Sequence, residues 1–240
     1  NSNPVWTADG RSVVYTSGGL TTGHGTIRRR RADGTGAADT LVALPLRGIN
    51  DVVLTPDSTQ FIVRLIAPPS RDIAIAHRGD TVSTPLLASP AYDEISPALS
   101  PDGRWLAYAS RESGRLEVFV RPYPNVGSGR WQVSQAGGVS PIWSRGGREL
   151  FYQNGAGALV SAAVLPGSTF TLGAQAVLFD ASRFAGTSNG ALYYDVAPDD
   201  KRFVFLRPVS ESGAGAADKL VQITNWGAEV RAKVAGKAPQ

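Results

Sequence analysis

The chain repeats one hairpin sequence five times, and this repeat constrains the fold more than any other feature. The clearest copy is Leu99-Ser100-Pro101-Asp102-Gly103-Arg104, and Trp105-Leu106-Ala107-Tyr108 follows it directly. Proline presets φ in a turn, aspartate binds nearby backbone N–H groups, and glycine tolerates positive φ. Apolar residues flank the turn on both sides. The pattern therefore predicts a strand, a tight turn with a bulge, and a second strand.

Each copy places a large apolar residue three positions before the Asp or Gly of its turn. These anchors are Trp6, Leu54, Leu99, Trp143 and Val196, and successive anchors are 48, 45, 44 and 53 residues apart. A period of about 40 to 50 residues with four strands per unit is typical of β-propeller blades. We therefore predict an all-β fold, a β-propeller of four-stranded blades, with five blades visible in residues 1–226.

The residues that recur within the hairpins have structural explanations. Aspartates at the shared turn position are predicted to cap their own hairpins: Asp9, Asp57, Asp102 and Asp199. Recurring aromatic side chains are predicted to fill the core between blades: Trp6, Trp143, Tyr15, Tyr108, Tyr152 and Phe205.

The end of the repeat raises the question of how the ring closes. No fourth strand follows the predicted third strand of the last blade at 220–224, and residues 1–3 are too short to supply one. The ring is then an incomplete or open six-bladed ring, which further sequence or a partner would complete, because sheet edges are normally covered. Residues 227–240 form a basic tail, and Val230 and Val234 at i, i+4 spacing predict a short helix there.

Composition limits the chemistry. The chain has no Cys and only two histidines, His24 and His77, both in polar segments. Metal sites on propellers need clustered ligands. We predict no catalytic residue, no cofactor and no metal site.

Charge points to docking surfaces. The net charge is +4, and the basic excess lies at residues 28–31 and in the last 22 residues. On a strand, Arg28 and Arg30 face one way, and Arg29 and Arg31 face the other. These arginines, with Arg231 and Lys233 of the tail, are candidates for binding an acidic protein or an anionic membrane; a solvated strand is the alternative. The excess is too small to predict nucleic-acid binding.

A second set of candidates precedes the predicted inner strands. Asp93 and Glu94 lie just before the inner strand of blade three, and Asp51 lies at the equivalent place before blade two. Because inner strands begin near the propeller axis, these residues are candidates for the rim of the central channel. Solvated loop positions are the alternative.

The repeats resemble the WD40-like (PD40) repeats of TolB-type propellers, including those at the C-terminus of bacterial serine/threonine kinases. The resemblance rests on the hairpin copies and on residues 117–124, 148–152, 194–199 and 224–226. It implies peptide or protein binding, often outside the cytoplasm. No kinase motif is present.

We therefore expect a non-catalytic protein-binding scaffold, an extrinsic subunit of a larger, membrane-bound complex. It would be bacterial, and periplasmic or peripheral at the membrane surface. Two alternatives stay open: a sensing domain of a longer receptor kinase, and an accessory propeller of a hydrolase.

Overall fold

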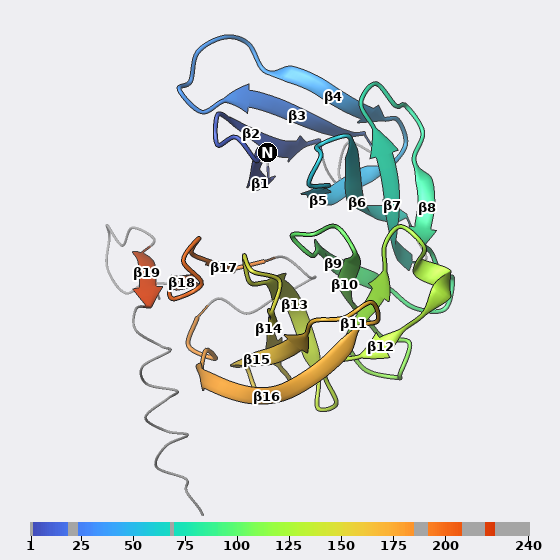
Figure 1. Cartoon of the computed structure of the whole chain (residues 1–240). Helices are drawn as coiled ribbons and strands as arrows, with labels where there is room; N and C mark the ends of the chain where they lie inside the picture. The colour runs from blue at the N-terminus through green and yellow to red at the C-terminus, as the bar shows by residue number, and fades with distance from the viewer. Residues whose placement is uncertain (1, 19–23, 68–69, 185–191, 208–218, 224–240) are drawn as a thin grey trace, which may run out of the picture.

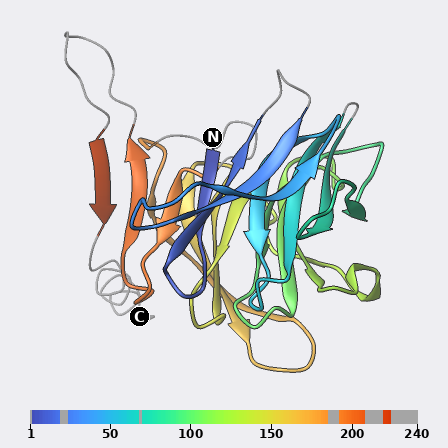
Figure 2. The same cartoon turned by 90° about the horizontal axis from the view of Figure 1, so that it is seen from above.

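A computed structural model of the chain describes residues 2–18, 24–67, 70–184, 192–207 and 219–223. Its strands form five antiparallel sheets, arranged as blades around a common axis (Figure 1). The strands nearest the axis are β1, β5, β9, β13 and β17, and Figure 2 shows the blades from the side. The predicted β-propeller of five visible blades is confirmed. The predicted tail helix lies outside the described residues.

Four of the sheets contain four described strands and the last contains three. Blade one contains β1 (Ser2–Trp6), β2 (Ser12–Ser17), β3 (Gly25–Arg31) and β4 (Asp39–Leu44). Blade two contains β5 (Gly48–Leu54), β6 (Gln60–Ala67), β7 (Ser70–His77) and β8 (Thr84–Leu87). Blade three contains β9 (Glu94–Leu99), β10 (Trp105–Ser110), β11 (Glu117–Pro122) and β12 (Trp131–Gln132), with the short 3-10 turn η1 (Val126–Ser128).

Blade four contains β13 (Gly138–Trp143), β14 (Glu149–Asn154), β15 (Ala158–Leu165) and β16 (Thr171–Asp180). Blade five contains β17 (Tyr194–Val196), β18 (Phe203–Arg207) and β19 (Lys219–Ile223).

The hairpin turns have the geometry that the repeat predicts. The bulge position has positive φ in all five copies, at Gly10, Ser58, Gly103, Gly147 and Asp200. The capping prediction is also confirmed. In blade three, for example, Asp102 Oδ1 accepts hydrogen bonds from the Ser100 hydroxyl at 2.5 Å and from the Arg104 N–H at 3.1 Å.

The core is divided between neighbouring blades rather than gathered at one centre. Four buried clusters join blade one to two, two to three, three to four, and four to five. Among the described residues, no cluster joins blade five to blade one. In the described part of the chain, the space between these two blades is therefore an open sector of the ring (Figure 1).

Candidate protein-binding surface

One face of blade one looks into the open sector. Val5, Val14 and Ile27 pack into the cluster shared with blade two. The side chains that alternate with them lie on the other face of the sheet, because successive residues of a strand point to opposite sides. This face comprises Trp6, Val13, Tyr15, Arg28 and Arg30, and strand pairing joins Trp6 to Val13, Val13 to Arg30, and Tyr15 to Arg28. We call it the blade-one face.

Blade four shows what this face normally does in the ring. The equivalent residues are Trp143, Leu150, Tyr152, Val160 and Ala162, which have the same strand pairing. All five belong to the cluster that blade four shares with blade three. The Trp143 indole also donates a hydrogen bond to the Ala98 carbonyl of blade three at 3.1 Å.

The described residues leave the blade-one face only partly covered. The exposed fraction of Trp6 is 61%, whereas that of Trp143 is 5%. Val13 and Tyr15 are only half-buried, and no described core cluster includes either of them. The core prediction for the recurring aromatics is confirmed for Trp143, Tyr108, Tyr152 and Phe205. It is wrong for Trp6, and Tyr15 is only half-buried, because no described blade packs against this face.

The arginine run splits into two pairs, as strand alternation predicts. Arg29 forms an ion pair with Asp39 at 2.7 Å, and Arg31 forms one with Asp33 at 2.6 Å. These arginines lower the pKa of both aspartates. Two of the four arginines of this run therefore already have carboxylate partners within blade one.

The arginines of the blade-one face bind only main-chain oxygens among their described contacts. Arg28 donates to the Ala38 carbonyl at 3.3 Å, and Arg30 donates to the Gly34 carbonyl at 3.1 Å. The Nε atom of Arg28 is buried and has no hydrogen-bond partner in the described part of the chain. Two guanidinium groups thus share a sheet face with two aromatic side chains, and neither has a described carboxylate partner.

Blade three shows what an arginine at this position requires in a covered interface. Arg121 pairs with Leu106 as Arg30 pairs with Val13, and it faces blade two. Its Nε donates to the Tyr108 hydroxyl at 2.8 Å, and its NH2 lies 3.8 Å from a Glu112 carboxylate oxygen. A covering surface for the blade-one face would therefore need to supply a similar acceptor, because a buried unpaired charge is costly.

The predicted rim carboxylates are dispersed among the blade interfaces. Asp51 lies on β5, where its Oδ2 is 2.5 Å from Nε of the fully buried Arg64. Its Oδ1 accepts a hydrogen bond from the Asn3 amide of blade one at 3.2 Å. Burial raises the pKa of Asp51, although Arg64 opposes the shift. Asp51 therefore joins two blades through its existing partners.

Asp93 and Glu94 belong to the interface between blades two and three. Asp93 accepts a hydrogen bond from the Arg71 N–H at 2.8 Å and lies 3.5 Å from the Arg71 guanidinium. Glu94 is 4% exposed, and its Oε2 has no described hydrogen-bond partner. Burial, reinforced by the charge of Asp72, raises the pKa of Glu94 to about 7.

Two predicted docking residues of the tail cannot be placed in the fold. Arg231 and Lys233 lie beyond the described residues. Within the described ranges, no group of three or more His, Asp or Glu side chains is placed to hold a metal ion. No helix in these ranges is long and apolar enough to cross a membrane.

Sequence reasoning missed two features of this region. Arg64 interrupts the apolar run Phe61–Leu65, and a charged residue there is a signal for a buried ion pair. The difference between Trp6 and Trp143 has no local signal, because it depends on which blade stands beside each one.

Comparison with known proteins places the chain by its fold. No protein-family model and no curated protein matches the sequence. Among solved structures, a putative TolB from Agrobacterium tumefaciens matches with a TM-score of 0.66 and 14% identity, over 94% of this chain and 77% of that one. TolB from Acinetobacter baumannii matches with a TM-score of 0.64 and 14% identity, over 90% of this chain and 51% of that one.

An enzyme contains a similar fold. A puromycin-hydrolyzing peptidase from Mycobacterium tuberculosis matches with a TM-score of 0.57 and 22% identity, over 91% of this chain but only 36% of the peptidase. These identities establish likeness of fold alone. From its sheets and its matches, the chain has a β-propeller fold similar to that of TolB.

Proposed function

We propose that the chain is a non-catalytic scaffold that binds another protein through the blade-one face. The observation that carries this proposal is the 61% exposure of Trp6, where the equivalent Trp143 is buried against a neighbouring blade. Tryptophan, tyrosine and arginine are the residues most enriched at the energetic centres of protein interfaces. The blade-one face presents all three.

The chemistry of this face defines the partner. A covering surface must fit around two aromatic rings and place carboxylates near Arg28 and Arg30, as Glu112 is placed near Arg121 in blade three. We infer a protein partner with an acidic patch that is large enough to cover the face. An extrinsic position on a membrane-bound complex in the bacterial periplasm, or at the membrane surface, is part of the same proposal.

Charge reversal tests the proposal on the full-length protein isolated with its native partners. Arg28→Glu with Arg30→Glu should reduce co-purification of the partner at least tenfold. The matched control is Arg29→Glu with Arg31→Glu, which makes the same charge change on the opposite face of β3. Equal loss in both variants, or no loss in the first, would overturn the proposal.

A photo-crosslinking residue at Trp6 identifies what covers the face. A crosslink to a separate acidic protein is the expected result. A crosslink to another part of the same polypeptide would show instead that the face is covered within the chain. Binding only to vesicles that contain anionic lipid would replace the protein partner with a membrane surface.

A second candidate, an accessory propeller of a hydrolase, is favoured by the peptidase match over 36% of that enzyme. The chain also contains Gly-Thr-Ser-Asn-Gly at 186–190, which fits the Gly-x-Ser-x-Gly pattern of hydrolase nucleophiles. This segment lies outside the described residues. Peptide hydrolysis by the full-length protein that Ser188→Ala abolishes would favour a catalytic role for the chain over the scaffold.

A further inference from the structure

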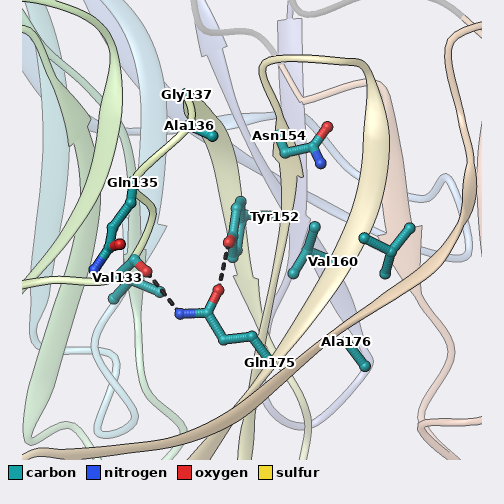
Figure 3. A pocket seen from close by; sticks show the side chains of 10 residues that line it. Val133, Gln135, Ala136, Gly137, Tyr152, Asn154, Val160, Gln175 and Ala176 are labelled. Atoms are coloured by element: carbon teal, nitrogen blue, oxygen red, sulfur yellow. Dashed lines mark hydrogen bonds between the residues drawn. The ribbon is translucent and has the colours of Figure 1, made fainter. Parts of the chain in front are cut away.

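A hollow of about 420 Å³ lies between blades three and four (Figure 3). Its walls are the segment that leaves blade three, from Val133 to Gly137, and the strands β14, β15 and β16 of blade four. The hollow borders the middle of β16, at residues 175–177.

The hollow arises from a mismatch between two outer strands. The outer strand of blade three, β12, has only two residues, whereas β16 has ten. A side-chain bridge spans the space: the Tyr152 hydroxyl donates to Gln175 Oε1 at 2.7 Å, and Gln175 Nε2 donates to the Val133 carbonyl at 2.8 Å (Figure 3). Burial raises the pKa of Tyr152 to about 12, so its hydroxyl remains a donor at neutral pH.

The chemistry of the hollow is neutral. None of the ten residues that line it is charged, although the chain contains 44 charged residues in its 240. Gln135, Asn154 and Gln175 supply amide groups, and Val133, Val160 and Val177 supply apolar surface. Such a site fits uncharged groups that combine hydrogen bonding with apolar contact.

The edge of β16 also lacks the protection that the other described outer strands carry. Edge strands usually avoid pairing with foreign chains through charged side chains, proline or short length. β4 carries the Arg29–Asp39 ion pair, β8 contains Pro85, and β12 is two residues long. In contrast, β16 has neither charge nor proline from Thr171 to Phe179, and Val177 is 61% exposed.

We propose that β16 and the hollow together bind an extended, uncharged peptide segment of a partner protein by strand addition. β16 is the last strand of its sheet, so backbone N–H and C=O groups along its outer side are available to an added strand. Every second side chain of that strand would point toward the same side. One of these side chains would enter the hollow.

The pairing of β16 limits the length of the added segment. The register with β15 shifts between Leu159 and Val160 and again between Ala162 and Val164, so the longest uninterrupted run of pairing on β16 is Gln175–Val177. Bulges of this kind bend a strand and interrupt pairing. The peptide should therefore pair over about four residues, with the rest of its contact made by side chains in the hollow.

The proposal is tested by selecting from a random library of twelve-residue peptides against the full-length protein. Selected peptides should share a short uncharged stretch of alternating apolar residues. Both Val177→Lys and Val177→Glu should weaken their binding at least tenfold, because a charge of either sign would be buried at the added strand. Thr84→Lys, at the exposed start of β8, is the matched control and should leave binding unchanged.

Hydrogen exchange supplies a readout that a merely structural change would not give. Binding of a selected peptide should slow amide exchange in β16 and leave exchange in β4 unaltered. The proposal is overturned if the selected peptides are charged, if they bind the Val177 variants normally, or if β16 gains no protection. Arg28→Glu with Arg30→Glu should retain peptide binding, so this site and the blade-one face can fail independently.

Discussion

Trp143 and Trp6 occupy the same position in two blades, but their surroundings differ. Trp143 packs against blade three and donates its indole N–H to the Ala98 carbonyl. Trp6 begins the same kind of hairpin but has no described blade beside it, and most of its surface is exposed. The comparison shows that a blade repeat specifies its own hairpin, whereas burial of its anchor residue depends on the neighbouring blade.

The largest difference in stability is expected when each tryptophan is replaced by alanine. Trp143→Ala should lower the free energy of unfolding by about 3 to 5 kcal/mol, because it removes a buried ring and leaves a cavity. Trp6→Ala should change it by less than about 0.5 kcal/mol, because the ring is already in contact with solvent. Urea denaturation of both variants measures the two effects. Equal effects would show that Trp6 is covered in solution.

The second test compares arginines in a covered and an uncovered position. Arg64→Met should lower the free energy of unfolding by about 3 kcal/mol, because it leaves the Asp51 carboxylate buried without its cation. Arg28→Met should have a far smaller effect, because it removes no described ion pair. The same denaturation experiment measures both. A large effect at Arg28 would place that side chain in a covered interface.

The third test uses pH and concerns Glu94, in the interface between blades two and three. Its pKa of about 7 in the folded state exceeds the value of 4.5 expected in the unfolded chain. The folded state therefore binds the proton more tightly. The stabilisation from Glu94 is complete below about pH 4.5 and is lost as the pH rises through about 7.

Glu94→Gln should remove this pH dependence and raise the free energy of unfolding at pH 8 by about 3 kcal/mol. Urea denaturation at pH 5 and pH 8 measures the difference. The pKa of Asp39 on blade one shifts in the opposite direction, because Arg29 lowers it. Asp39→Asn should therefore not reproduce the effect of Glu94→Gln. An unchanged slope between pH 5 and pH 8 in Glu94→Gln would contradict the assignment.

Sequence predicted most of the fold because each hairpin is determined locally. The proline, aspartate and glycine of the turn and the flanking apolar residues act within about ten positions, and all five hairpins formed as expected. The outer strands were harder to define. The outer strand β16, for example, extends from Thr171 to Asp180. Its alternation is weak because it is half-exposed and bulged.

The candidate sites were predicted less well because they depend on contacts between blades. Strand alternation separated Arg28 and Arg30 from Arg29 and Arg31, but only the fold shows which pair looks into the open sector. The hollow beside β16 could not be predicted at all. It results from unequal lengths of β12 and β16, and its bridge joins Val133, Tyr152 and Gln175 across two blades.

The division of the core into four clusters also determines how the molecule should come apart. In a closed ring every blade is held from two sides, so no blade is a natural starting point for unfolding. In the described arrangement, blades one and five each share a core cluster with one neighbour. The chain then resembles a linear array of modules whose ends fray first. Amide hydrogen exchange should therefore be slowest in blade three. A molecule bound in the open sector, in contact with blades one and five, should slow local unfolding of both.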